Sequence, residues 1–390
     1  MNKVTFLSIF SMIALLTSIG FRVKSNEVTP IKASKSEGKF ISNKKDVSPP
    51  VFYRGADLSF SSQLESLNVP FYDKGVKMTS LKIFKNHGCN LVRLRLWHGA
   101  AAQNNIKDVI AYSKRVKQAG MSLLLDIYYS DTWADVSKQP APVAWKGLQR
   151  SALLDSVYNY TYSTIQQFKA NGVMPDIVQI GNEINYGMLW DISGKLKGTS
   201  DPGFKDLDEI LKKAIAGLYA ADTQHHAKTL IQYANLKGAD KFFQNLQNDK
   251  VPFDIIGVSY YPFAPTNDLN DLTKQLSALA TGFNADILVV ETSFPFTKAR
   301  KESKGANALG DNFVQVPGIP VSPQGQKQYL LELRKAIKKI PNNHGIGFCY
   351  WAPDWVAYDG PPYPYVSAWD NQTLFDFHNN ALPGLDAFKP

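Results

Sequence analysis

The feature that most constrains the fold is an alternation of short apolar runs with amphipathic stretches along the chain. The apolar runs have the length and residue types of buried strands and cover 51–59, 90–97, 122–130, 176–183, 229–235, 254–261, 286–293 and 345–351. Stretches with helical periodicity lie between them, among them 75–88, 106–120 and 204–222. Several of these stretches end at a glycine, as helices commonly do: Gly88, Gly120 and Gly172. Eight alternations of strand and helix predict an α/β fold, a (β/α)8 TIM barrel, as a single catalytic domain.

Polar and aromatic side chains follow these predicted strands at the points where the strands end. They are Asp57, Arg95, Asp126, Asn182, Glu183, Tyr260, Glu291 and Trp351. In barrels of this class the carboxyl ends of the strands form the active site. These eight residues, at seven of the eight predicted strand ends, therefore indicate one functional rim.

Two glutamates at this rim carry the chemistry. Glu183 lies in VQIGNEINYGMLW (178–190), and Glu291 ends the apolar run ILVVE (287–291). A carboxylate that ends a buried strand is costly unless it is paired, so a structural salt bridge is the alternative for each. Hydrolysis of a glycosidic bond requires two such carboxylates, one as general acid/base and one as nucleophile. We interpret Glu183 and Glu291 as that catalytic pair.

The strings around these residues are more specific than the glutamates alone. In chain order they are GADLS (55–59), VRLRLW (92–97), YYSDTWAD (128–135), VQIGNEINYGMLW (178–190), GVSYYPF (257–263), VVETSFPFT (289–297) and YWAPDW (350–355). Over residues 51–390 they resemble glycoside hydrolase family 53, the endo-β-1,4-galactanases that act on galactan side chains of pectin and on arabinogalactan. The resemblance implies a retaining, endo-acting arabinogalactan endo-β-1,4-galactanase in which Glu183 is the acid/base and Glu291 is the nucleophile.

The resemblance also implies roles for the residues around the pair. Asn182 would hold the 2-hydroxyl of the sugar, and Arg95 would bond the region of the nucleophile. Tyr260 or Tyr261 would orient the nucleophile, and strand alternation favours Tyr260. Trp351 would form the floor beneath the sugar, with packing in the barrel as its alternative. Four further residues would line the cleft, with loop capping or packing as their alternative: Asp57, Asp131, Trp133 and Trp355.

The first fifty residues differ in composition from the rest of the chain. Lys3 precedes the uncharged apolar stretch 4–21, which predicts a cleaved signal peptide over 1–22, with a retained membrane anchor as the alternative. Residues 23–50 are rich in Lys and Ser and predict a flexible segment, so the hydrolase domain is expected over 51–390. We therefore expect a secreted protein, located in the periplasm or at the cell surface.

The distribution of charge argues against binding of nucleic acid, and the two cysteines indicate buried side chains. The chain has a formal net charge of +9, but residues 1–50 hold eight Lys or Arg and three Asp or Glu and so carry +5 of it. The remaining charge is too weak and dispersed for binding nucleic acid. Cys89 and Cys349 resemble small buried hydrophobic residues, with a disulfide as the alternative.

Metals, cofactors and protein partners are not predicted. The sequence has no cluster of Cys and His with zinc spacing, and the stretch 296–313 is basic where calcium ligands would gather. We therefore expect no metal site and no cofactor. The expected partner is the polysaccharide substrate, β-1,4-galactan, and no stable protein partner is implied.

Two alternatives to the galactanase interpretation remain. The same fold and mechanism would serve another β-1,4-glycan, such as mannan or xylan. A non-catalytic glycan-binding barrel would predict the loss of one glutamate, whereas both are present. The sequence does not set the product length, which depends on the loops 295–318 and 355–371.

Overall fold

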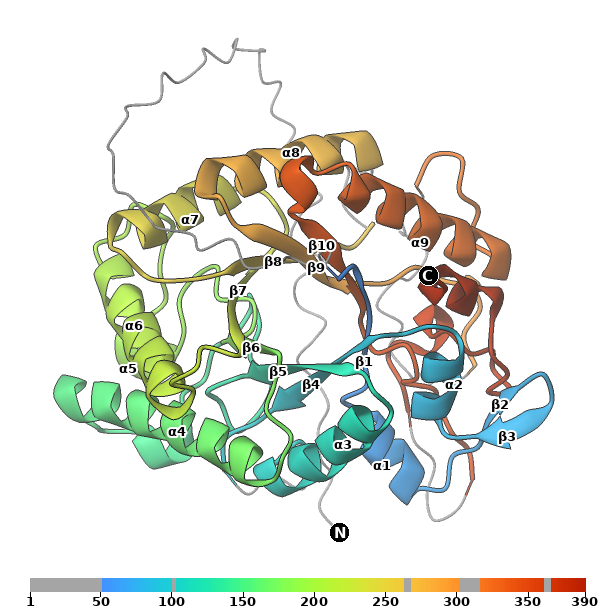
Figure 1. Ribbon diagram of the computed structural model, residues 1–390, viewed down its shortest axis with the longest axis horizontal. Helices are drawn as coiled ribbons and strands as arrows, with labels where there is room; N and C mark the ends of the chain where they lie inside the picture. The colour runs from blue at the N-terminus through green and yellow to red at the C-terminus, as the bar shows by residue number, and fades with distance from the viewer. Residues whose placement is uncertain (1–50, 100–102, 263–267, 302–315, 361–365) are drawn as a thin grey trace. The chain divides into compact units, whose positions relative to one another are not determined.

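The computed structural model describes residues 51–99, 103–262, 268–301, 316–360 and 366–390. In this part of the chain, eight parallel strands close into a barrel and follow one another around it in sequence order (Figure 1). The strands are β1 (Tyr53–Asp57), β4 (Leu91–Leu96), β5 (Ser122–Ile127), β6 (Ile177–Ile180), β7 (Lys228–Ala234), β8 (Ile255–Ser259), β9 (Asp286–Thr292) and β10 (Gly345–Tyr350). The predicted TIM barrel is confirmed, whereas the predicted signal peptide and the segment 23–50 lie outside the described residues.

Helices surround the barrel on its outer side (Figure 1). They are α1 (Ser61–Ser66), α2 (Ser80–Asn86), α3 (Ile106–Gln118), α4 (Arg150–Ala170), α6 (Phe204–Ala221), α7 (Ala239–Asn248), α8 (Leu269–Phe283) and α9 (Pro323–Lys338), with the short α5 (Trp190–Ser193) in the connection after β6. The predicted helical stretches 106–120 and 204–222 match α3 and α6. The glycines predicted to end helices lie two residues after α2, α3 and α4.

The predicted stretch 75–88 is wrong in its first part. Residues Val76–Met78 form β3, which pairs antiparallel with β2 (Phe71–Asp73) in a hairpin, and only then does α2 begin. Thr79 caps this helix, since its side-chain oxygen accepts a hydrogen bond from the Lys82 N–H. The helical periodicity in the sequence therefore began before the cap, in residues that form a strand of the hairpin.

The barrel interior is divided into an apolar layer and a polar layer. Successive side chains of a strand point to opposite faces, so each strand sends alternate residues inward. Near the amino ends of the strands, the inward side chains form a buried apolar cluster of Leu91, Leu124, Ile177, Leu230, Ile255, Leu288, Val290 and Ile346. The next inward positions are polar and charged, and they lead to the carboxyl ends of the strands. The apolar cluster thus packs directly beneath the polar layer inside the barrel.

Four further features complete the description of the fold. Cys89 and Cys349 are both buried and free, as predicted. Among the described residues, no helix combines the length and the apolar character needed to cross a bilayer. In the same part of the chain, no group of three or more His, Cys, Asp or Glu side chains is placed to hold a metal ion. Residues 302–313 of the predicted basic stretch lie outside the described residues.

Candidate active site

A β-bulge turns Glu291 into the barrel. On β9, Leu288 and Val290 belong to the inner apolar cluster, so strict alternation would send the next side chain outward. The pairing with β8 changes register between Gly257 and Ser259, and the pairing with β10 changes register in the same part of β9. One extra residue of β9 is accommodated there, and Glu291 therefore also points inward. A bulge that redirects a side chain beside an active site is a recurrent use of this device.

The end of β6 presents Asn182 and Glu183 together. Gly181 follows the strand with φ of 74°, and an added Cβ would lie 2.7 Å from the Ile184 side chain. Glu183 itself has φ of 48°, an uncommon conformation for a residue with a side chain. This turn breaks the strand alternation, so two successive side chains face the interior. Unfavourable backbone conformations of this kind persist where the surrounding structure holds them, often at active sites.

Glu291 is held by one cation and two neutral donors. Its Oε1 atom lies 2.8 Å from Nη2 of Arg93 and accepts a hydrogen bond of 3.0 Å from the Gln232 amide. Its Oε2 atom accepts a hydrogen bond of 2.9 Å from the Tyr261 hydroxyl. These donors fix the plane of the carboxylate and stabilise its negative charge.

Glu183 has a different environment. It is partly buried, and its Oε1 atom accepts a hydrogen bond of 2.7 Å from the Ser259 hydroxyl. Burial first, and the nearby Glu291 carboxylate second, raise the pKa of Glu183 to about 8. The Gln232 amide donates to both Ser259 Oγ and Glu291 Oε1, at 2.9 and 3.0 Å, and so connects the two glutamates. At neutral pH the site therefore holds one protonated carboxyl beside one held by a guanidinium.

Arg93 is the centre of the polar layer. Its side chain is fully buried, and its guanidinium is surrounded by six acceptor residues from five strands or their ends. Its partners, at 2.7 to 3.4 Å, are Asp57, Asp126, Asn182, Gln179, Gln232 and Glu291. One guanidinium thus ties the nucleophile candidate to β1, β4, β5, β6 and β7.

Aromatic rings form a wall at the carboxyl ends of β1, β4, β5 and β10. We call Phe60, Trp97, Tyr128, Trp133, Trp351 and Trp355 the aromatic cluster; the Phe60 and Trp355 rings stack at 4.1 Å, and the Trp133 and Trp351 rings are 6.4 Å apart. Arg95 lies among these rings, with its Cζ atom 4.0 Å from the centre of Trp133 and 4.9 Å from that of Phe60. These are cation–π distances.

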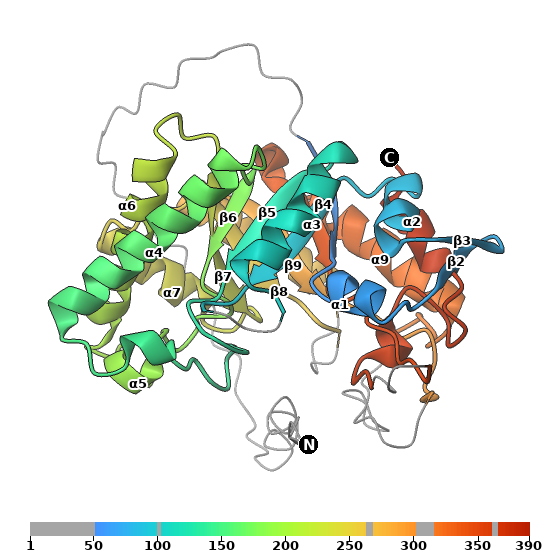
Figure 2. The same ribbon diagram turned by 90° about the horizontal axis from the view of Figure 1, so that it is seen from below.

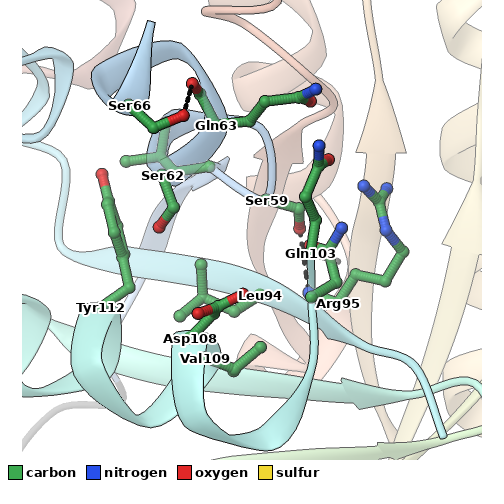
Figure 3. A pocket seen from close by; sticks show the side chains of 12 residues that line it. Ser59, Ser62, Gln63, Ser66, Leu94, Arg95, Gln103, Asp108, Val109 and Tyr112 are labelled. Atoms are coloured by element: carbon green, nitrogen blue, oxygen red, sulfur yellow. Dashed lines mark hydrogen bonds between the residues drawn. The ribbon is translucent and has the colours of Figure 1, made fainter. Parts of the chain in front are cut away.

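Figure 3 views Arg95 from the side of α1 and α3, where a small pocket of about 190 Å³ lies. The guanidinium points away from Tyr112 and Asp108 of that pocket. The Arg95 N–H donates to Ser59 Oγ at 2.9 Å, which fixes the backbone at this point.

A comparison with known proteins decides the family of this barrel. Residues 53–388, which include every side chain described above, match the sequence model of glycosyl hydrolase family 53. The chain belongs to glycosyl hydrolase family 53. It is therefore a glycosidase, and the resemblance stated from the sequence is confirmed.

Individual members of family 53 agree with this assignment. The chain is 34% identical over 347 residues to a protein of Cellvibrio japonicus named arabinogalactan endo-beta-1,4-galactanase, covering 87% of this chain and 90% of that protein. Its structure is similar to the GH53 catalytic domain of Ignisphaera aggregans, with a TM-score of 0.78, 32% identity, and coverage of 89% and 98% of the two chains. A fungal β-1,4-galactanase structure gives a TM-score of 0.75 and 29% identity, with 87% and 99% of the two chains covered.

The predicted role of Arg95 in this family 53 site is wrong, because the arginine that contacts Glu291 is Arg93. Both arginines point inward from β4, two residues apart, and the sequence does not distinguish their depth. Arg93 is paired in register with Asp57 and lies in the polar layer, whereas Arg95 is nearer the carboxyl end and turns to the aromatic cluster. Within the described residues, Nε and Nη1 of Arg95 have no hydrogen-bond partner.

The preference for Tyr260 over Tyr261 is also wrong. The Ser259 side chain points inward to Glu183, so Tyr260 points outward and Tyr261 points inward. The Tyr260 side chain packs in the outer core, and its hydroxyl finds no hydrogen-bond partner among the described residues. Tyr261 donates to Glu291 instead.

The remaining predicted site residues lie at the same end of the barrel, with different surroundings. Asn182 accepts a hydrogen bond from Arg93 at 2.8 Å and donates to the Ala134 carbonyl at 2.9 Å, so its amide is held in place. Asp57 is buried in its ion pair with Arg93 and does not line the cleft, contrary to that prediction. Asp131 accepts from the Val143 N–H at 2.7 Å and contacts His98, which is the loop-capping alternative. The three tryptophans among the predicted residues, Trp133, Trp351 and Trp355, all belong to the aromatic cluster.

The sequence interpretation missed Arg93, Gln232 and Ser259, which contact the glutamates. It also missed Gln179, which bonds Arg93 and Gln232. The signal for the two glutamines was present, since each is flanked on both sides by apolar or aromatic residues, in IVQI (177–180) and LIQYA (230–234). Both are fully buried, and a fully buried polar side chain requires partners. An isolated amide in a buried strand could therefore have been assigned to the polar layer.

The surroundings of Glu183 predict a pH dependence. A general acid must be protonated, so kcat/KM should fall as the pH rises through about 8, the pKa of Glu183. The Ser259 hydroxyl stabilises the ionised form and lowers this pKa, so Ser259→Ala should move the alkaline limb to higher pH. The measurement is kcat/KM against pH.

The matched control for Ser259→Ala is Ser293→Ala. Ser293 is also buried at the end of a strand, and its hydroxyl donates to Gln372 instead of to a glutamate. Its removal should leave the alkaline limb near its wild-type position. An unchanged or lowered limb in Ser259→Ala would contradict the role of Glu183 as the acid.

Proposed function

We propose that this family 53 glycosidase is an endo-β-1,4-galactanase that acts on galactan and arabinogalactan, including galactan side chains of pectin, with retention of configuration. The galactan substrate is supported by the relatives named above, two of which are named as β-1,4-galactanases. One observation carries the mechanism: a carboxyl with its pKa raised to about 8 lies beside a second carboxyl that is bonded to a buried arginine. Environments that separate two carboxyls in this way assign the acid and the nucleophile.

In the proposed first step, Glu291 attacks the anomeric carbon of the sugar. The contacts from Arg93, Gln232 and Tyr261 orient its carboxylate. At the same time the protonated Glu183 donates its proton to the glycosidic oxygen, and the C–O bond breaks. A glycosyl ester of Glu291 forms, and the reducing-end part of the glycan leaves with the proton from Glu183.

In the second step, Glu183 acts as the base. It removes a proton from a water molecule that attacks the anomeric carbon, and the ester bond to Glu291 breaks. The product leaves with its original configuration, and Glu183 is protonated again. Ser259 stabilises Glu183 while it is charged between the two steps, because its hydroxyl donates to Oε1.

The aromatic cluster supplies a surface for the sugar. The Trp351 side chain is 8% exposed and is fixed by the Trp133, Trp355 and Trp369 rings, the last at 4.7 Å. An indole face of this kind matches the apolar C–H face of galactose. Asp354 holds the loop that carries Trp355 onto α1, since Ser61 Oγ donates to its carboxyl. We infer that Trp351 forms the floor at the point of cleavage.

The substrate is tested on a panel of β-1,4-linked galactan, mannan and xylan. We expect internal cleavage of galactan into short oligosaccharides, because the family strings extend over the whole barrel. Chromatography of the products distinguishes the outcomes. Cleavage of mannan or xylan with galactan left intact would contradict the assigned specificity, and binding without cleavage would show a non-catalytic barrel.

We also propose that the protein is exported. The support is the uncharged stretch 4–21, which follows Lys3 and precedes a polar segment. Mass spectrometry of the protein isolated from its natural host should give a mature N-terminus near residue 23. An N-terminus at Met1 on protein recovered from the cytoplasm would contradict export.

A further inference from the structure

The loop after β6 carries an exposed aromatic side chain near the proposed acid/base. Tyr186 is 37% exposed, whereas Trp351 and Trp355 of the aromatic cluster are 8% and 4% exposed. Three residues of extended chain span at most about 11 Å, so the Cα atoms of Glu183 and Tyr186 are no farther apart than that. Tyr186 therefore lies at the carboxyl end of the barrel, on the side of Glu183.

The Tyr186 backbone is tied rigidly to that of Glu183. The Tyr186 carbonyl accepts hydrogen bonds from the Trp190 indole N–H and from the Leu196 N–H, each at 2.9 Å. Gln139 connects this segment to the acid/base: its carbonyl accepts from the Trp190 N–H at 2.8 Å, and its amide donates to the Asn182 carbonyl at 2.7 Å. These hydrogen bonds hold the loop without using the Tyr186 ring.

The ammonium group of Lys195 lies over the rings of Tyr186 and Trp190. Lys195 Nζ lies 5.3 Å from the centre of the Tyr186 ring and 4.4 Å from that of Trp190. An exposed ring face accepts the C–H face of a sugar, and an adjacent ammonium group donates to sugar hydroxyls. We call Tyr186, Trp190 and Lys195 the α5 platform, because they lie at or beside α5, which follows the carboxyl end of β6 (Figure 2).

The position of the α5 platform determines which part of the glycan it meets. Glu183 gives its proton to the oxygen of the departing sugar, so groups beside Glu183 face the leaving part of the chain. We propose that the α5 platform is a subsite for galactosyl units on the reducing-end side of the cleaved bond. The inference rests on the proposed function and adds where the leaving part of the galactan is bound.

The test compares long and short leaving groups. Tyr186→Ala is measured on galacto-oligosaccharides that extend several units past the cleaved bond, and on an aryl β-galactobioside whose phenol leaving group ends at that bond. We expect kcat/KM to fall about fivefold to tenfold on the oligosaccharides, the size expected for loss of one aromatic stacking contact. On the aryl substrate the fall should be less than twofold, and the oligosaccharides should shift their preferred cleavage position.

Two variants serve as controls. Tyr186→Trp keeps a ring to stack on and should restore most of the activity on the oligosaccharides. Tyr162→Ala removes a tyrosine that is equally exposed, 37%, but lies on the outer helix α4 against Tyr158. It should behave as wild type on both substrates.

Three results would overturn the inference. Equal losses on both substrates would mean that Tyr186 supports the position of Glu183 and binds no sugar. No loss on the oligosaccharides would mean that the α5 platform is not a subsite. If the wild type itself does not cleave galactan, both the proposed function and the proposed subsite are wrong. Measuring the wild type on galactan therefore distinguishes this outcome from the first two, in which the wild type is active.

Discussion

The site depends on one buried guanidinium. Arg93 is inaccessible to solvent and lies within ion-pair distance of three carboxylates, from Asp57, Asp126 and Glu291. Removing one partner of a buried ion pair costs about 3–5 kcal/mol, because the other charge is left without compensation. Here the loss of Arg93 would leave several carboxylates facing each other. A lysine would not replace it, since an ammonium group lacks the planar fork that reaches several acceptors at fixed angles. The geometry of the nucleophile and the stability of the barrel interior therefore depend on the same side chain.

The two glutamates differ because the barrel gives them different partners. Glu291 receives a guanidinium, an amide and a phenol, all of which stabilise negative charge. Glu183 is supported by the Ser259 hydroxyl and is exposed to the field of Glu291, and burial keeps its pKa near 8. Gln232 links Ser259, which bonds Glu183, to Glu291, so a change in the charge of one carboxyl affects the other. The proposed division into acid and nucleophile is thus a consequence of where β4, β7 and β8 direct their inward side chains.

Much of this arrangement could be predicted from the sequence, because it follows from local patterns. The apolar runs predicted the eight strands, and the longer sequence strings identified the family. What strand alternation could not explain or decide depended on the pairing between strands. Strand alternation predicts that Glu291 points outward, because Val290 before it points inward. Glu291 points inward because of a bulge, and this bulge is visible only in the pairing of β9 with β8 and β10. Alternation likewise does not tell whether Arg93 or Arg95 reaches the nucleophile, because both face the interior and only their depth differs. The choice between Tyr260 and Tyr261 went to the wrong residue for a simpler reason: Ser259 points inward, so the inward tyrosine is Tyr261.

The most direct measurement compares Glu183→Ala with Glu291→Ala on substrates of different leaving-group acidity, with and without azide. General acid/base assistance is typically worth about 10²–10⁴-fold, so loss of Glu183 should be severe for poor leaving groups and mild for acidic ones. In Glu183→Ala the glycosyl-enzyme should accumulate, and azide should restore turnover with retained configuration. In Glu291→Ala no covalent intermediate should form, and azide should attack from the opposite face to give the inverted product. If Glu183→Ala lost activity equally on all leaving groups, or if the wild type released an inverted product, the assigned roles would be contradicted.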